Sequence, residues 1–540
     1  MDYLLFQDTD NDSSRENSPE SSIFVSSNKP TDNDLIKIYN YFVYKGYYNI
    51  VSIQLINLIT TVFLYFLFLF LVMCIDYQGL IDIKTTEENL STYVNFNNLL
   101  NSNPFYITCM ILMGLYIIIR IHGLIIDTLK YKNISQFYKK TLKIESKILP
   151  SISWSKIIEK LNVLYGKEYN SYTINARILR KENILCDIYR TKVSEYLFSN
   201  LMEWNIYYCL MGAIFDENNQ VKRRFFDNKD SIKKDIRMNL IVISILTFLF
   251  MPFLILYMVF YCLLKYGANF YNHPSKIVAR QWSIKTKWNF RYYNEPKHLM
   301  DTRLDIGSIY AKEYCSQFNS KVFETILKFI IFLASSFFMV LLLLSLINEH
   351  ILFNLNITHD KPVIWYMGIL GSIIALGKNI SHERKHDSSN ESLSKLVAKI
   401  KYFPFNIMDI ESLKVRNKII KLYEYQIYTL LKECLSVIVV PFKLIYILNY
   451  VDSIVDFISN NLERDINLGY ISKKSNFNNI NDTSNLTTLI SFQEHRNNFP
   501  EWGENIENFM VNSEIFDKLK ENNLSIDENN LTFESHISIH

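Results

Sequence analysis

The chain has 540 residues, a formal net charge of +3 and only 13 glycines. Neither GxGxxG nor GxxxxGK[ST] occurs, which excludes the common nucleotide-cradling loops, and the near-neutral charge gives no general attraction to nucleic acid. The seven cysteines form no CxxC pair, which argues against a zinc site or a disulfide framework. We therefore expect no cofactor, no metal, no catalytic residue and no nucleic-acid partner.

Residues 1–34 are predicted to form a disordered acidic arm in the cytosol. Residues 2–34 carry eight acidic side chains against Arg15 and Lys29, and they contain many Ser and Asn residues. Within this arm, Tyr3–Phe6 has the form of a tyrosine-based sorting signal, which a clathrin adaptor would bind.

The next feature is a membrane core over 35–461. About 20 apolar residues cross a hydrocarbon core of roughly 30 Å, because a helix rises about 1.5 Å per residue. Two stretches meet this length, and we predict spans at about 53–75 and 105–126. The loop between them is mainly acidic, whereas 127–238 is crowded with Lys and Arg. Basic regions stay in the cytosol, so 127–238 is expected to be a cytosolic helical region and the N-terminus is cytosolic.

A third apolar stretch, 239–264, is followed by 265–321, which holds ten basic and four acidic residues. A full crossing would place this basic region in the lumen, against the usual charge rule. Pro252 lies in the middle of the stretch and interrupts helical hydrogen bonding. We therefore predict a re-entrant segment at about 239–264 with Pro252 as its hinge, in preference to a tilted span, and we assign 265–321 to the cytosol.

Two further spans are predicted at about 325–347 and 362–378, followed by a cytosolic helical region at 379–426. The apolar stretch 427–448 contains charged residues and Pro441, so we predict a second re-entrant segment hinged at Pro441. Residues 462–540 are expected to form a mostly disordered cytosolic tail with an ordered island near 491–503. The predicted fold is an all-α polytopic membrane protein with four transmembrane helices, two re-entrant segments, cytosolic helical regions and both termini in the cytosol.

A specific motif occupies 280–318. It contains Arg280-Gln-Trp282-Ser283, then an aromatic run ending in Asn294-Glu295-Pro296-Lys297-His298, then Arg303-Leu304, and finally Ala311 to Phe318. This resembles the central signature of the autophagy-related protein 9 family, which runs RxWS, FNELxH, RL and AxxYxxQF with the same spacing. Pro296 replaces the usual Leu, and the segment 271–273 also departs from the family pattern.

The resemblance implies a function. Members of that family form homotrimers on Golgi-derived and endosomal vesicles and on the autophagosome precursor membrane. They scramble phospholipids between leaflets without ATP, and they accept lipid from a bridge-like lipid transfer protein as the membrane expands. The expected function is therefore a phospholipid scramblase of autophagy, not an enzyme. The alternative is a membrane scaffold or vesicle seed that recruits other autophagy initiation proteins, with scrambling incidental.

Scrambling requires a polar path for lipid head groups, and charged side chains at membrane depth usually face such a path. Our lipid-path candidates are basic residues in or beside apolar segments: Arg120, His122, His273, Lys276, Arg280 and Lys285. Arg120 and His122 could instead extend to the cytosolic end of their span.

A second group of polar residues lies within the signature motif. We expect a buried hydrogen-bonded network that fixes helix packing or the trimer interface, made of Trp282, Asn294, Glu295, His298 and Arg303. Asn294 and His298 would share one helix face if the helix continues through Pro296. A single ExxH pattern is half of what a di-metal carboxylate site needs, so a metal role is not expected.

Overall fold

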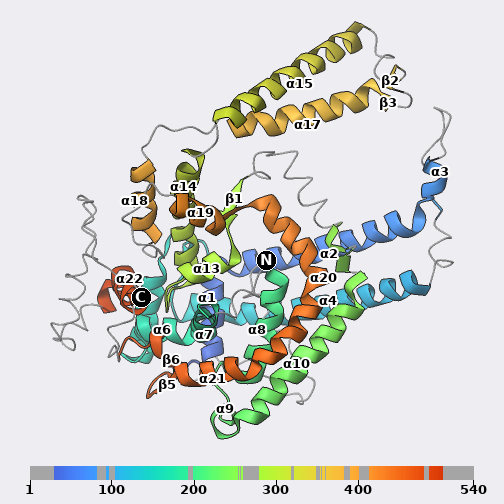
Figure 1. Cartoon of the computed structure of the whole chain (residues 1–540). Helices are drawn as coiled ribbons and strands as arrows, with labels where there is room; N and C mark the ends of the chain where they lie inside the picture. The colour runs from blue at the N-terminus through green and yellow to red at the C-terminus, as the bar shows by residue number, and fades with distance from the viewer. Residues whose placement is uncertain are drawn as a thin grey trace.

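The structure is a computed structural model that describes residues 29–81, 93–95, 104–191, 199–252, 254–255, 257–259, 279–317, 321–347, 353, 355–358, 361–381, 389–400, 413–478 and 486–502. These residues are mainly helical, with three two-stranded antiparallel sheets (Figure 1). Three of the predicted features, Tyr3–Phe6, His273 and Lys276, lie outside the described residues.

The helices of the first half are α1 (Asp32–Val43), α2 (Tyr47–Leu69), α3 (Tyr77–Ile81), α4 (Pro104–Lys140), α5 (Trp154–Tyr165), α6 (Ser171–Ile178), α7 (Arg180–Tyr189), α8 (Asn200–Ile214), α9 (Arg224–Asp227) and α10 (Lys229–Leu249). Those of the second half are α13 (Ile284–Phe290), α14 (Lys297–Gln317), α15 (Lys321–Ile347), α17 (Val363–Ser381), α18 (Ser389–Ile400), α19 (Leu413–Leu422), α20 (Gln426–Ile447), α21 (Val451–Asn461) and α22 (Leu486–Asn498). The paired strands are β1 (Arg280–Trp282) with β4 (Tyr423–Tyr425), β2 (Asn356–Thr358) with β3 (Lys361–Pro362), and β5 (Leu462–Asp465) with β6 (Gly469–Ser472).

Four described helical stretches are long and apolar enough to cross a membrane: Tyr47–Leu69, Met110–Lys140, Thr325–Ile347 and Gln426–Asn461. The first three overlap the predicted spans 53–75, 105–126 and 325–347. The fourth contains the segment that we expected to insert only partly, while the predicted span 362–378 corresponds to a shorter apolar helix, Val363–Ala375. The apolar window of Gln426–Asn461 is 39% buried inside the protein, against 6% in each of the other three. Partial insertion of 427–448 therefore stays a prediction, and its extensive protein contact supports it.

Helix α4 changes its surroundings along its length. Its first half exposes Ile111 and Ile118, whereas Ile134 and Tyr138 in its second half are about 1% exposed and belong to the main hydrophobic core. An apolar face that is exposed over one half of a helix suits lipid, and a buried face over the other half requires protein contact. The change falls near Leu129, close to the end of the predicted span 105–126.

Helices α15 and α17 pair closely and extend away from the remaining helices (Figure 1). Their contact depends on a glycine, because a Cβ atom on Gly377 would lie 2.6 Å from Cγ1 of Ile331. At Gly371 the nearest atom belongs to Phe338 at 3.7 Å. Small residues of this kind let two apolar helices approach closely.

The two predicted re-entrant segments pack against each other. Helix α10 buries Ile236, Leu240 and Ser244 along one face, and α20 buries Val440 and Leu444. Helix α20 continues through Pro441, so the hinge that we predicted at that residue is not a break in the helix. Helix α10 ends at Leu249 and Phe250 lies in a turn, so a break does occur just before Pro252.

The two ends of the predicted membrane core are also more ordered than expected. Helix α1 begins at Asp32, inside the predicted arm, because Thr31 and Asp34 form a capping box at its start. The strands β5 and β6 and the residues up to 478 are folded inside the predicted tail. Helix α22, Leu486–Asn498, overlaps the predicted island and begins five residues earlier.

Candidate functional site

The signature motif begins with strand β1, which pairs with β4 at the start of α20. Arg280 Nη1 donates a hydrogen bond of 3.1 Å to the main-chain oxygen of Tyr423, and its guanidinium lies 3.9 Å from the ring centroid of Tyr425. These contacts hold the partly exposed Arg280 beside the first turn of α20. Lys285, another lipid-path candidate, is exposed on the short helix α13.

The predicted polar group Trp282 to Arg303 makes three separate sets of contacts. Arg303 and Glu295 form a paired ion contact, with Nε to Oε1 at 2.9 Å and Nη2 to Oε2 at 2.8 Å. Both side chains are nearly buried, and Arg303 also donates to the main-chain oxygen of Phe290. The indole of Trp282 donates to the main-chain oxygen of Leu304 at 2.9 Å. These bonds join β1, α13 and the beginning of α14.

Asn294 belongs to a different set. Its backbone has φ of 56°, and its side chain donates to the main-chain oxygen of Ser475 at 2.8 Å. Asn183 of α7 completes the set with two hydrogen bonds. Its side-chain oxygen accepts from the main-chain N–H of Asn294, and its side-chain nitrogen donates to the side-chain oxygen of Asn294. Helix α14 begins only at Lys297, with the Pro296 oxygen accepting its first hydrogen bonds. The helix therefore does not continue through Pro296, and Asn294 shares no helix face with His298.

His298 faces the N-terminal helix. Its Nδ1 lies 3.0 Å from the hydroxyl oxygen of Tyr39 on α1. Burial, with a smaller effect of Lys45, lowers the pKa of His298 to about 4. Burial likewise raises the pKa of the Tyr39 hydroxyl. Both groups are therefore neutral at pH 7, and their contact is a hydrogen bond between uncharged groups.

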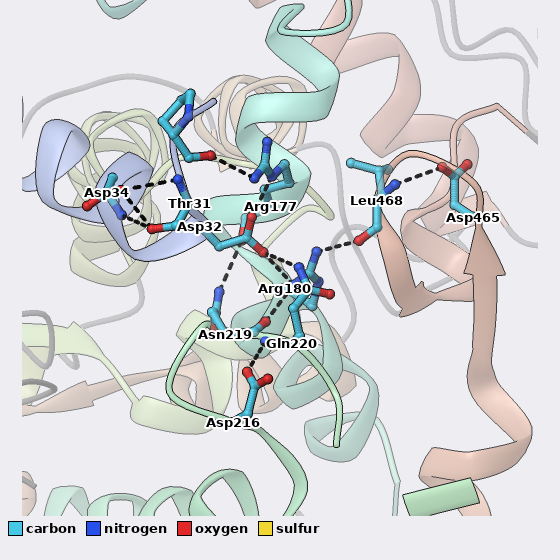
Figure 2. Close-up of polar contacts among 11 residues, drawn as sticks. Thr31, Asp32, Asp34, Arg177, Arg180, Asp216, Asn219, Gln220, Asp465 and Leu468 are labelled. Carbon is cyan, nitrogen blue, oxygen red and sulfur yellow. Dashed lines mark hydrogen bonds and ion pairs between the residues drawn. The ribbon is translucent and has the colours of Figure 1, made fainter. Parts of the chain in front are cut away.

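A buried charged site that the sequence pattern did not predict lies at the start of α1 (Figure 2). The Asp32 carboxylate accepts hydrogen bonds from Arg177 Nε at 2.5 Å, Arg180 Nη1 at 2.6 Å and Gln220 Nε2 at 2.7 Å. Arg180 also donates to the main-chain oxygens of Asn219 and Leu468. We call these four side chains the Asp32 clamp: Asp32, Arg177, Arg180 and Gln220.

The Asp32 clamp connects four parts of the chain. They are α1, the α6–α7 pair, the turn before α9, and the loop between β5 and β6 (Figure 2). The side chains of Arg180 and Asp32 are 0% and 1% exposed, so neither charge is hydrated and each depends on the other. The local sequence signals a helix start at Thr31 but carries no sign of the two arginines, which lie more than 140 residues away.

Arg120 and His122 both lie on α4, where Arg120 is partly buried and His122 is exposed. An open cavity of about 480 Å³ lies between α4 and α10 with the residues that follow it. Its lining residues are Leu112, Met113, Tyr116, Leu246, Thr247, Phe250, Leu254 and Tyr257. Among the described residues, no group of three or more His, Cys, Asp or Glu side chains is placed to hold a metal ion.

Comparisons with known proteins agree with this architecture. The family model described as "Autophagy protein ATG9" matches residues 29–478. Autophagy-related protein 9 of Dictyostelium discoideum is 28% identical over 546 residues, which covers 93% of this chain and 77% of that protein. The protein of the same name from Saccharomyces cerevisiae strain S288c is 27% identical over 472 residues, covering 82% of this chain and 47% of its own length. The chain therefore spans about half the length of this yeast relative.

Among solved structures, the cryo-EM structure of Schizosaccharomyces pombe Atg9 is similar in fold. Its TM-score is 0.62 at 23% sequence identity, and the match covers 83% of this chain and 98% of that one. The family match extends over most of the chain and includes the signature motif, the Asp32 clamp and the membrane-length helices. The chain belongs to the autophagy protein ATG9 family and is a membrane protein of autophagy.

Proposed function

We propose that the protein is an ATP-independent phospholipid scramblase that equilibrates lipids between leaflets as autophagosome membranes form and expand. It acts as a homotrimer on Golgi-derived and endosomal vesicles, with both termini in the cytosol. Its partners are phospholipids, further copies of itself, a bridge-like lipid transfer protein and other autophagy initiation proteins. A clathrin adaptor that binds Tyr3–Phe6 is also proposed.

The observation that carries this proposal is the paired layer of α10 and α20. Ser244 on α10 donates a buried hydrogen bond of 2.8 Å to the main-chain oxygen of Pro441 on α20. Both helices also expose large apolar side chains away from this bond, including Ile245 and Leu246 on α10 and Leu435 and Phe442 on α20. A layer that is apolar on its outer face and attached to protein on its inner face is suited to partial insertion.

The polar ends of the layer are consistent with the same placement. Arg237 at the start of the apolar part of α10 forms an ion pair of 2.6 Å with Asp452, and Lys233 contacts Asp456 at 3.0 Å. Both acids lie on α21, directly after α20. This charged end therefore belongs in water or among head groups. Helix α20 carries another ion pair, Lys432 with Glu424 at 2.8 Å, near its beginning, so we place only the apolar middle of the layer in hydrocarbon. Helices that enter without crossing thin the barrier that a lipid head group must pass.

Scrambling itself is downhill and needs no nucleotide. It needs polar groups along the barrier, because an unpaired charge in hydrocarbon costs several kcal/mol. We propose Arg120 and His122 on α4, Arg280 and Lys285 near α20, and His273 and Lys276 as the groups that lipid phosphates meet. The buried polar residues of the signature motif fix the packing of the surrounding helices: Trp282, Asn294, Glu295, His298 and Arg303. We also propose that they contribute to the trimer interface.

The test is reconstitution of the full chain into liposomes that contain a lipid with a fluorescent head group. An impermeant quencher should remove fluorescence from both leaflets in the absence of ATP, whereas protein-free liposomes should lose only the outer-leaflet signal. The substitution Arg120→Glu should slow the loss. Lys132→Glu is the matched control, since Lys132 is exposed further along α4. Loss confined to the outer leaflet with the wild-type protein would contradict the proposal.

The second candidate is a membrane scaffold or vesicle seed. The observation that favours it is the folded body outside the membrane-length helices, where α1 and α22, from opposite ends of the chain, pack into one core. A scaffold should retain partner binding and vesicle traffic in the Arg120→Glu variant even when scrambling is lost. Loss of autophagy in cells that carry this variant, with partner binding intact, would show that scrambling is essential and would reject the scaffold alternative.

A further inference from the structure

The cavity between α4 and α10 is lined mainly by apolar side chains. Five of its eight lining residues are Leu, Met or Phe, and they come from both sides of the cavity. The hydroxyl of Thr247 is engaged within its own helix, where it donates to the main-chain oxygens of Ile243 at 2.8 Å and Ser244 at 3.0 Å. Thr247 therefore presents mainly its methyl group to the cavity. Such a lining favours an apolar occupant.

The size of the cavity matches one lipid chain. An apolar protein cavity of about 150 Å³ holds one benzene molecule, which has six carbon atoms. The volume here is about 480 Å³, roughly three times larger. It therefore has room for about 18 carbon atoms, which is the size of a single acyl chain.

The surroundings of the cavity identify the source of that chain. On α4 the neighbouring Ile111 and Leu115 are exposed, and on α10 the neighbouring Ile245 and Leu249 are exposed. These residues belong to the parts of the two helices that we place at membrane depth. With the helices placed in this way, the cavity opens towards bilayer hydrocarbon. The turn at Phe250, two residues before Pro252, forms part of its wall, so the interruption of α10 contributes to its shape.

A basic residue lies one helical turn from the cavity. Leu112, Tyr116 and Arg120 are spaced by four residues on α4, so they lie along one side of that helix. Arg120 is the member nearest the basic, cytosolic end of α4. An acyl chain in the cavity would lead to a head group near Arg120, where the guanidinium can pair with a phosphate.

We propose that this cavity binds one acyl chain of a cytosolic-leaflet phospholipid, with the lipid phosphate at Arg120. The biological role of this site rests on the proposed scramblase function, since the site would bind a lipid before its head group crosses the membrane. The existence of the site can be tested independently of that function, because lipid binding and scrambling are measured separately.

The test uses the full chain in phosphatidylcholine liposomes that contain a phosphatidylcholine with a diazirine on one acyl chain. After irradiation, the modified peptides are mapped by mass spectrometry. We expect cross-links in the segments 112–116 and 246–257. Thr247→Phe places a ring in the cavity and should reduce those cross-links at least fivefold. Ile245→Phe is the matched control, because Ile245 is exposed on the same helix and does not line the cavity.

Arg120→Gln tests the head-group contact. It should reduce cross-linking at 112–116 while Lys132→Gln leaves it unchanged, and retained protein stability in detergent verifies folding. The inference is overturned if Thr247→Phe, folded normally, leaves the cross-links at 112–116 and 246–257 as strong as in the control. Scrambling is measured on the same liposomes. Cross-links without scrambling would reject the proposed function and keep the site, whereas scrambling without these cross-links would reject the site alone.

Discussion

Asp32 and Arg180 form a buried ion pair of 2.6 Å between residues 148 positions apart in the chain. The pair attaches the first helix of the folded body to α7, and the additional hydrogen bonds of Arg180 extend the attachment to Asn219 and Leu468. The contact therefore holds the start of α1, at Asp32, against the rest of the folded body.

Asp32→Asn should destabilise the protein by about 3–5 kcal/mol, since it leaves Arg180 buried without its counter-charge. The expected result is a lower melting temperature in detergent and faster proteolysis near α1. Asp34→Asn is the matched control, because Asp34 is partly exposed and takes part in the capping box instead of the buried pair. Equal effects of the two substitutions would show that the buried pair has no special role.

Ser244→Ala should weaken the attachment of α10 to α20. It removes the hydroxyl that donates to the Pro441 oxygen in a buried contact, at a cost of about 1 kcal/mol. Ser336→Ala is the control, because the Ser336 hydroxyl bonds within its own exposed helix turn. Cysteine cross-linking between α10 and α20 should become less efficient in the first variant only. Unchanged cross-linking would show that the surrounding apolar residues, and not this hydrogen bond, hold α10 against α20.

Stability should fall as the pH is lowered from 6.5 towards 4. Burial lowers the pKa of His298 from 6.5 to about 4 in the folded protein, so the unfolded chain binds a proton in this window and the folded chain does not. The contribution of His298 is therefore complete above pH 6.5 and decreases by up to about 1.4 kcal/mol per pH unit below it.

His298→Gln should make the pH profile of unfolding shallower between pH 6.5 and 4. His495 is a useful comparison, because burial lowers its pKa to about 3 and it acts in the same direction. The measurement is the melting temperature of wild type and variant across this pH range. Parallel profiles would indicate that other groups dominate the acid sensitivity.

Gly377→Ala should separate α15 from α17. The new methyl carbon would lie 2.6 Å from Cγ1 of Ile331, which is closer than packed side chains allow, so about 1–3 kcal/mol of overpacking is expected. Gly368→Ala is the matched control on the same helix, where a Cβ atom meets nothing within 4 Å. Disulfide cross-linking between the two helices, measured in liposomes, should decrease for Gly377→Ala. Equal cross-linking in both variants would contradict the close contact.

The sequence by itself determined the features that depend on neighbouring residues. Apolar length located α2, the first half of α4 and α15, because a helix that crosses hydrocarbon must present apolar side chains over about 20 residues. The start of α1 also depends on side chains only three positions apart, Thr31 and Asp34, but we assigned both residues to the disordered arm and did not predict this helix start. The resemblance of 280–318 to the family motif was equally local, and it identified the family correctly.

Only the tertiary structure decided how these segments meet. Asp32 lies inside a stretch whose composition resembles a disordered arm, and it becomes buried because Arg177 and Arg180 neutralise it from a distant helix pair. The helix begins only after Pro296, so Asn294 does not share a helix face with His298 and forms hydrogen bonds with Asn183 and Ser475 instead. Long-range contacts of this kind depend on how complete helices pack, and the local sequence pattern does not indicate which distant residue will be the partner. The pairing of Ser244 with Pro441 and the cavity beside α4 belong to the same class, because both exist only between elements.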